Sequence, residues 1–158
     1  MGDVLNSIGS DKNGELKDKL DAFQVRCREA GLKVTPQRIA IYTVLIETEE
    51  HPSAEMVCRK VRRDFPNISL DTVNRTLLTL NEIGAAFIVE GSGDAKRFDG
   101  NLVQHQHFKC LACKRIIDLF ADPLSKIKVP SSLNNCTVLK KTVYFEGICD
   151  SCQEKSQS

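Results

Sequence analysis

The sequence predicts an α/β fold of the α+β type, with helices in the first part of the chain and short strands in the second. Two observations predict this order. Apolar residues recur at helical spacing as far as about residue 83, and beyond it they alternate with polar residues in short stretches. With 158 residues, of which 41 % are hydrophobic, the chain can form one ordinary domain or two small ones around a packed core.

The first 14 residues are small and polar, and we expect residues 1–14 to form a flexible tail. Leu16, Leu20 and Phe23 then begin an apolar face at helical spacing, which predicts a first helix that ends near residue 31. Three more helices are expected, because a Ser or Thr that can cap a helix precedes each further periodic stretch. They would follow Thr35, Ser53 and Ser69 and run to about residues 49, 65 and 83.

A two-stranded ribbon is expected after the helices. Residues 86–89 are apolar, residues 91–94 carry the turn sequence Gly-Ser-Gly-Asp, and residues 96–99 would return as the second strand. Short helices followed by such a ribbon is the order of a winged helix-turn-helix domain, a class that binds double-stranded DNA. We therefore expect a winged-helix DNA-binding domain over residues 15–99.

The remaining residues, 100–158, are expected to form a small α/β domain. Patterns of period two predict strands at residues 108–110, 115–119 and 137–145, and residues 124–128 could form a helical turn. No stretch of about 18 apolar residues is present, so we expect no membrane span.

Two Cys-x-x-Cys pairs are the strongest chemical signal. Each pair can hold a metal from one tight turn, and four thiolates would complete the closed tetrahedral shell of a structural zinc. The alternative is two unrelated pairs of core or redox cysteines, although a thioredoxin-like pair would need a βαβ context that the pattern lacks. The four candidate ligands are Cys110, Cys113, Cys149 and Cys152.

The other cysteines, Cys27, Cys58 and Cys136, have no near partner in the sequence, and we expect them in the core. The chain holds 7 cysteines, an odd number, and shows no secretory signal. We therefore expect a reducing compartment, the cytoplasm, where paired cysteines bind metal more often than they form disulfides.

A second metal signal comes from His105 and His107, because alternate residues of a strand project from the same face and can chelate one ion. Asp99 lies at the end of the ribbon, and Asp118 lies on the neighbouring expected strand. Mixed imidazole and carboxylate ligation suits Fe²⁺, Mn²⁺ or Zn²⁺. Spacing alone leaves open whether these two histidines bind a metal or have a structural role. It gives less reason to expect a metal ligand at His51.

The formal net charge is only +1, so a DNA-binding protein of this composition needs local basic patches and a dimer to double them. Two groups of residues fit that role, although the first could also be a solvated helix face. The candidates are Arg59, Lys60, Arg62 and Arg63 on the third expected helix, and Asn74 and Arg75 near the start of the fourth. The sequence has no nucleophile elbow, phosphate-binding glycine loop or HExxH motif, so we do not expect an enzyme.

Together these residues resemble the ferric uptake regulator family from about Leu32 to Cys152. The resemblance implies a homodimeric, metal-dependent transcriptional repressor with an N-terminal winged helix and a C-terminal dimerisation domain. It implies zinc on the four cysteines and a regulatory Fe²⁺ or Mn²⁺ on His51, Asp99, His105, His107 and Asp118. The motifs that carry it are Leu32-Lys-Val-Thr-Pro-Gln-Arg38, His51-Pro-Ser-Ala, Phe65-Pro-Asn-Ile-Ser, Asp71-Thr-Val-Asn-Arg-Thr-Leu77, Arg97-Phe-Asp99, His105-x-His107-x-x-Cys110-x-x-Cys113 and Cys149-x-x-Cys152.

Two departures from the family pattern bear on function. Asn74 stands where many members carry a Tyr that contacts DNA, and Asn can bond adenine, so the preferred operator is expected to differ. Gln104 and Gln106 stand where some members place ligands of a further metal site, which we expect to be absent here.

The sequence favours one branch of the family. At the position of Asp118, members of the peroxide-sensing branch tend to carry Asp and iron-sensing members tend to carry Glu. The chain therefore resembles the peroxide-sensing branch, and we expect a peroxide sensor that works by oxidation of histidine ligands. An iron- or zinc-responsive regulator of metal uptake is the alternative. Two other classes of function remain as alternatives: a zinc-stabilised protein-interaction module, and a thiol redox or metal-dependent enzyme.

Overall fold

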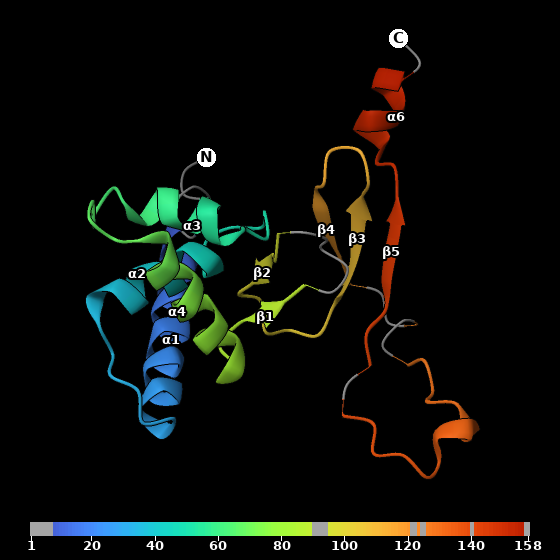
Figure 1. Cartoon of the computed structure of the whole chain (residues 1–158), viewed down its shortest axis with the longest axis horizontal. Helices are drawn as coiled ribbons and strands as arrows, with labels where there is room; N and C mark the ends of the chain where they lie inside the picture. The colour runs from blue at the N-terminus through green and yellow to red at the C-terminus, as the bar shows by residue number, and fades with distance from the viewer. Residues whose placement is uncertain (1–7, 90–94, 121–122, 124–125, 140, 157–158) are drawn as a thin grey trace, which may run out of the picture. The chain divides into compact units, whose positions relative to one another are not determined.

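The computed structural model describes residues 8–89, 95–120, 123, 126–139 and 141–156 (Figure 1). The chain divides into two compact units, one of Met1–Ile88 with Lys96–Leu102 and one of Val89–Ala95 with Val103–Ser158. The first unit is helical and the second is built on a mixed sheet, in the order that the sequence predicts. None of the helices in the described part of the chain has the length and apolarity that a membrane span requires.

The first unit contains four helices: α1 (Ile8–Glu29), α2 (Pro36–Ile46), α3 (Ala54–Val61) and α4 (Leu70–Glu82). The expectation of a flexible tail over residues 1–14 is wrong for residues 8–14, which belong to α1, whereas residues 1–7 lie outside the described residues. Apolar periodicity underestimates α1 because its first turns are polar. Adding a turn to a helix that has already formed requires no buried face.

The three predicted caps are present. Thr35 Oγ1 accepts a hydrogen bond from the backbone N–H of Arg38 at 3.2 Å, and Ser69 Oγ accepts one from Thr72 at 3.0 Å. Ser53 Oγ accepts from the third helix in the same way, at 3.4 Å. Each cap satisfies a backbone donor that the first turn of a helix leaves without a partner.

The helices of the first unit enclose one apolar core. Phe23 stacks on Tyr42 with their ring centroids 4.2 Å apart, and Ile41 and Leu77 are fully buried. Cys27 and Cys58 are buried in this core, as predicted. Cys136, by contrast, is exposed in the second unit, so its assignment to the core is wrong.

The predicted ribbon is present but short. Strands β1 (Phe87–Ile88) and β2 (Phe98–Asp99) pair antiparallel, with Ile88 opposite Phe98. The expected turn at residues 91–94 lies outside the described residues. Asp99 therefore ends its strand at the close of the winged-helix pattern, near the expected domain boundary.

The second unit contains a three-stranded sheet in the order β4-β3-β5, with β3 (Gln106–Cys110), β4 (Ile116–Leu119) and β5 (Tyr144–Gly147). β3 pairs antiparallel with β4 and parallel with β5. A 3-10 turn at Ser131–Leu133 precedes β5, and α6 (Asp150–Ser156) follows it.

Two elements of the second unit differ from expectation. The strand predicted at residues 137–145 begins only at Tyr144, and the exposed residues 137–139 show that alternation alone does not make a strand without a partner to pair with. The helical turn expected at residues 124–128 falls partly on residues outside the described chain, and residues 126–128 are not helical. The short polar α6 was not predicted, because it buries no apolar face.

Candidate nucleic-acid interface and metal centres

The predicted DNA-binding residues lie on α3 and α4, in different local settings. Arg59 and Arg63 are exposed, and Lys60 Nζ lies 3.5 Å from a carboxylate oxygen of Glu50. Arg62 instead donates from Nε to the backbone carbonyl of Ile68 at 3.2 Å, so it supports the link between α3 and α4.

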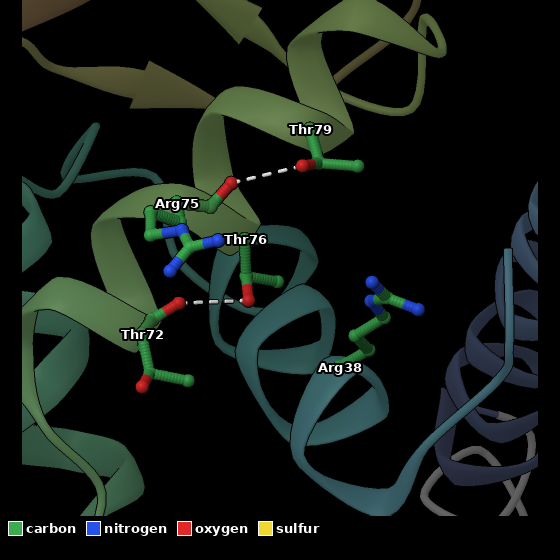
Figure 2. A pocket seen from close by; sticks show the side chains of 5 residues that line it. All are labelled: Arg38, Thr72, Arg75, Thr76 and Thr79. Carbon is green, nitrogen blue, oxygen red and sulfur yellow. Dashed lines mark hydrogen bonds between the residues drawn. The ribbon is translucent and has the colours of Figure 1, made fainter.

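On α4, the side chain of Arg75 is 78 % exposed and pairs with Asp71 one turn earlier at 3.7 Å. Asn74 is half-buried beside it. A residue that the sequence did not single out also belongs to this face. Arg38 of α2 and Arg75 line a shared hollow with three threonines of α4, as Figure 2 shows: Thr72, Thr76 and Thr79.

The threonines that line this hollow are neutral, so its positive charge comes from Arg38 and Arg75. Thr76 Oγ1 donates to the carbonyl of Thr72 at 2.8 Å, and Thr79 Oγ1 donates to that of Arg75 at 3.0 Å (Figure 2). Their hydroxyl protons are therefore used within the helix. The arrangement offers two guanidinium groups to an anion, and Arg38 Nη1 also donates to the carbonyl of Lys33 at 2.5 Å. The sequence signal that could have found Arg38 is its place in the first turn of α2, three residues after the cap Thr35.

The four predicted cysteine ligands come together within the second unit. β3 and β5 run parallel, so their carboxyl ends meet at one edge of the sheet, and each end leads into one Cys-x-x-Cys pair. The Sγ atoms of Cys110, Cys113, Cys149 and Cys152 all lie within 4.8 Å of one another.

The geometry and chemistry of this cluster fit zinc. Four Zn–S bonds of about 2.3 Å in a tetrahedron place the sulfurs about 3.8 Å apart, and Cys113 Sγ lies 3.8 Å from Cys149 Sγ. A closed set of four thiolates leaves no position for substrate, so the site is suited to a structural role.

The turn between β3 and β4 shapes the first pair. Lys114 follows Cys113 with a φ of 64°, and its N–H donates to the carbonyl of Cys110 at 2.9 Å. The left-handed conformation folds the chain back so that both thiols face the same point. Lys114 Nζ donates to the carbonyl of Leu111 at 2.6 Å.

Hydrogen bonds set different proton affinities within the cluster. The N–H of Cys149 donates to Cys110 Sγ at 3.3 Å, and backbone N–H donors lower the pKa of Cys110 to about 6. The Arg115 guanidinium, 3.3 Å from Cys149 Sγ, lowers the pKa of Cys149. Neighbouring thiols that share its proton raise the pKa of Cys152 to about 12. The metal-free cluster therefore holds part of its charge already, and a metal must displace the remaining proton.

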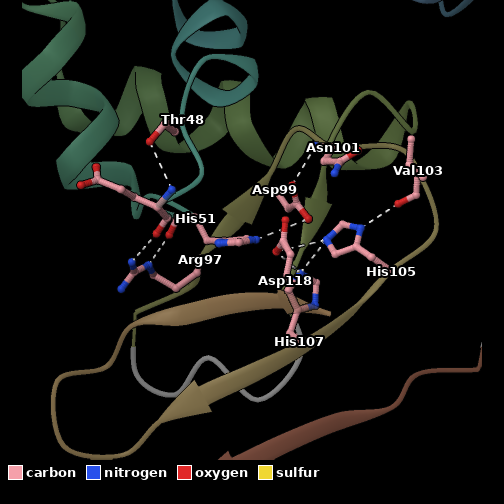
Figure 3. A network of polar contacts seen from close by, with 10 residues as sticks. Thr48, His51, Arg97, Asp99, Asn101, Val103, His105, His107 and Asp118 are labelled. Atoms are coloured by element: carbon pink, nitrogen blue, oxygen red, sulfur yellow. Dashed lines mark hydrogen bonds and ion pairs between the residues drawn. The ribbon is translucent and has the colours of Figure 1, made fainter. Parts of the chain in front are cut away.

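In the first unit, His51 and Asp99 form a pair, with His51 Nε2 at 3.6 Å from Asp99 Oδ2 (Figure 3). The backbone joins their two segments, because Phe98 donates to the carbonyl of Pro52 at 3.0 Å. Asp99 Oδ1 accepts from the N–H of Asn101 at 2.7 Å, which leaves Oδ2 for a metal or for His51.

Arg97 fixes the loop that carries His51. Its Nε donates to the carbonyl of His51, and its Nη2 donates to that of Glu50 at 2.8 Å (Figure 3). His51 itself has a φ of 49°, a conformation that costs energy for any residue except glycine. Sequence patterns do not identify Arg97 as a positioning residue, because the two carbonyls that it binds lie 46 and 47 residues away in the sequence.

In the second unit, His105, His107 and Asp118 form a second group (Figure 3). The β3–β4 register places His107 opposite Asp118, and Asp118 Oδ1 lies 3.4 Å from His105 Nε2 and 3.6 Å from His107 Nε2. His105 Nδ1 lies 2.7 Å from the carbonyl of Val103, which can only accept, so Nδ1 carries the proton and the Nε2 lone pair is available to a metal.

The two intervening glutamines do not join this group. Gln106 Oε1 accepts from the N–H of Val143 at 3.1 Å, so this side chain supports the entry to β5. Gln104 is exposed. The further metal site that some relatives carry stays a predicted absence.

Comparison with known proteins gives one consistent family. A family model described as the ferric uptake regulator family matches residues 29–145. The peroxide-responsive repressor PerR of Staphylococcus aureus (strain Mu50 / ATCC 700699) is 30 % identical over 141 residues, which cover 89 % of this chain and 95 % of that protein.

Solved structures are similar over most of both chains. The ferric uptake regulator Fur of Helicobacter pylori has a TM-score of 0.70 at 25 % identity, over 87 % of this chain and 93 % of that one. PerR from Streptococcus pyogenes has a TM-score of 0.50 at 28 % identity, over 85 % of this chain and 93 % of that one.

Proposed function

Since the chain belongs to the ferric uptake regulator family and is a metal-dependent transcription regulator rather than an enzyme, we propose that it is a homodimeric, peroxide-responsive DNA-binding repressor of the cytoplasm. The observation that carries the peroxide assignment is the set of three histidines with carboxylates only from aspartate, Asp99 and Asp118. The 30 % identity to a peroxide-responsive repressor over 89 % of the chain supports it.

In this proposal, the pair in the first unit and the group in the second unit bind one regulatory metal together. Each is incomplete alone, because His51 and Asp99 offer two donors while His105, His107 and Asp118 offer three. Five nitrogen and oxygen donors suit Fe²⁺ or Mn²⁺ and leave room for a small reactant. An ion bound by both units would couple metal occupancy to their relative orientation, and thus to DNA affinity.

Bound Fe²⁺ would supply electrons to peroxide beside its own ligands, which Mn²⁺ does poorly. The chain's contribution is to hold imidazoles at that point, and we expect His51 and His105 to gain one oxygen atom each. An oxidised imidazole is a poorer ligand, so the link between the units weakens and the DNA-binding arrangement loses its bias. The zinc-bound cysteines should react more slowly, since zinc has no redox chemistry and its shell is closed.

The proposed recognition helix is α4. Asn74 and Arg75 would contact base edges, while the cations of α3 (Arg59, Lys60, Arg62 and Arg63) would contact phosphates. The hollow between Arg38 and Arg75 supports this assignment, because it presents two guanidinium groups to an anion such as a backbone phosphate. The engagement of Arg62 with the Ile68 carbonyl makes it the least available of the four cations of α3.

The homodimer would form through the second unit. Leu139 is 92 % exposed, and Tyr144 and Phe145 on the edge strand β5 are exposed as well. Exposed large apolar side chains on the edge strand of the described sheet are typical of a protein interface. A dimer would also double the local basic patches, which a chain of net charge +1 needs for DNA.

The experiment is a gel shift on the protein's own upstream DNA, with Mn²⁺ or with Fe²⁺ under anaerobic conditions, before and after peroxide. We expect both metals to support binding and peroxide to abolish it only for the Fe²⁺ form, with mass spectrometry showing 16 Da additions on His51 and His105, which is roughly one oxygen atom each. Arg75→Ala serves as the DNA-binding control, and its affinity should fall by about 1–3 kcal/mol with either metal.

Asp118→Glu tests the branch. The extra methylene changes how the carboxylate meets the metal, and it should slow the peroxide reaction while iron-dependent binding remains. If the Fe²⁺-loaded wild-type protein still binds DNA after peroxide treatment, the protein is an iron or zinc sensor. The TM-score of 0.70 with an iron-uptake regulator makes that the alternative.

A further inference from the structure

Arg115 links the two Cys-x-x-Cys segments of the second unit. It lies directly before β4, and its Nη2 reaches Cys149 Sγ at 3.3 Å and Ser151 Oγ at 3.3 Å. Asp150 Oδ1 is a more distant partner, 3.9 Å from the same nitrogen. A side chain from the first Cys-x-x-Cys loop therefore donates directly to a sulfur of the second.

Charge makes this contact significant once zinc is bound. Four thiolates around Zn²⁺ leave a net charge of −2, and a guanidinium at hydrogen-bond distance from one sulfur offsets part of it. The neighbouring cation does not serve the same purpose, because Lys114 Nζ donates to the carbonyl of Leu111.

The buried pair Cys110 and Cys149 provides an internal comparison. Their exposed fractions are 0 % and 4 %, so access to solvent is similar. Cys110 Sγ accepts from the backbone N–H of Cys149, whereas Cys149 Sγ accepts from a cationic guanidinium. A cationic donor withdraws more electron density from sulfur than a neutral amide does.

We propose that Arg115 is a positioning residue of the zinc centre that holds the Cys149 thiolate and lowers its nucleophilicity toward electrophiles. The inference rests on the part of the proposed function that assigns zinc to the four cysteines. In a peroxide-responsive regulator, such protection would let the histidines react while the zinc centre remains intact.

The test uses the full-length zinc-loaded protein and iodoacetamide as the electrophile. The thiolate sulfur attacks the methylene carbon, a C–S bond forms, and the C–I bond breaks with release of iodide. Peptide mass mapping gives the alkylation rate at each cysteine, and a chromogenic chelator gives the rate of zinc release. Zinc content is measured first in every variant.

The variants are Arg115→Gln, Arg115→Lys and the matched charge control Lys155→Gln, at an exposed lysine of α6. We expect Arg115→Gln to raise the ratio of the Cys149 rate to the Cys110 rate by about 3- to 10-fold, a range that allows for the exposure of Arg115. Arg115→Lys should raise this ratio by about twofold, because lysine keeps the positive charge but lacks the planar guanidinium with its several N–H donors. Lys155→Gln should leave the ratio unchanged.

Each other outcome counts against the inference. Equal acceleration at all four cysteines would show that Arg115 only maintains the fold, and an unchanged ratio in a zinc-loaded Arg115→Gln protein would overturn the inference alone. If the wild-type protein contains no zinc, both the assignment of zinc to the four cysteines and this inference are wrong. If Arg115→Gln purifies without zinc, the ratio of the Cys149 rate to the Cys110 rate is measured in Arg115→Lys instead. A wild-type ratio in Arg115→Lys would then overturn the inference.

Discussion

The two candidate metal centres differ in how the fold supplies their ligands. All four cysteines belong to the second unit, where the parallel pairing of β3 and β5 brings them together. The histidines and aspartates that we propose as regulatory ligands are divided, with His51 and Asp99 in the first unit and the other three in the second. A metal bound within one unit would stabilise that unit, whereas the proposed regulatory metal would link its own binding to the relative orientation of the two units.

Cys113→Ser should have the largest effect, because it removes one thiolate from the undivided site. Structural zinc contributes roughly 10–16 kcal/mol of binding free energy in zinc-finger peptides, and we expect the second unit to lose both its zinc and its stability. Elemental analysis and sedimentation velocity measure zinc content and the dimer. Cys136→Ser, at an exposed cysteine outside the cluster, is the matched control and should keep both. A Cys113→Ser protein that remains folded, dimeric and zinc-loaded would contradict the comparison.

Arg97→Ala should affect only the divided site. It removes the two hydrogen bonds that hold the carbonyls of Glu50 and His51, so the His51 ligand loses its fixed position. Loss of a residue that orients a ligand weakens metal binding by about 10- to 100-fold, and calorimetric titration with Mn²⁺ measures the change.

Zinc content should stay at the wild-type level in Arg97→Ala, and Arg59→Ala, at an exposed position on α3, should leave Mn²⁺ affinity unchanged. Equal Mn²⁺ affinity in Arg97→Ala and wild type would mean that Arg97 does not position the ligand.

Zinc affinity should rise with pH. With a pKa of about 6, Cys110 is already a thiolate at pH 7, whereas Cys152, with a pKa of about 12, still holds its proton. Zinc must therefore displace at least the Cys152 proton, and the apparent affinity should increase about tenfold for each pH unit from 7 to 9. Competition with a chelator at several pH values measures the slope. A flat profile would mean that the metal-free cluster is already fully ionised.

Lys114→Gly should have the smallest effect. Among the described residues, only His51 and Lys114 are non-glycine residues with positive φ, and each lies at one of the two centres. Glycine at 114 relieves a left-handed conformation that costs roughly 1 kcal/mol or more, partly offset by its greater freedom in the unfolded chain.

We expect a net gain of about 0.5 kcal/mol, or roughly 2 °C in the thermal midpoint of the zinc-loaded protein. His51→Gly relieves the same conformation but removes a ligand, so it should abolish Mn²⁺ binding. A lower midpoint for Lys114→Gly would show that the bond from Lys114 to the Leu111 carbonyl matters more than the backbone conformation.

Local patterns predicted the fold where local forces decide it. The caps at Thr35, Ser53 and Ser69 and the strands around Cys110 follow from short-range spacing, and the structure contains them. Alternating residues alone also predicted a strand over residues 137–145. The strand forms only at Tyr144, where β3 is available as a partner.

The candidate sites show the same division. Side-chain type and spacing predicted the four cysteines as ligands and made His105 and His107 candidates, because ligands of these types follow simple rules. Arg97 and Arg115 were missed, since their roles depend on contacts 46 and 34 residues away in sequence. An isolated arginine carries no local signal that distinguishes a positioning residue from a solvated one.

The pairing of β3 with β5 also has a consequence for biosynthesis. Cys149 and Cys152 come after all the other candidate ligands in the sequence, so the ribosome makes them after the residues of the first unit and after β3 and β4. The helices of the first unit can fold while translation continues, because domains form in N- to C-terminal order as they emerge. The second sheet lacks β5 until then, so a nascent chain can already hold a folded helical unit before the second Cys-x-x-Cys pair can join the first.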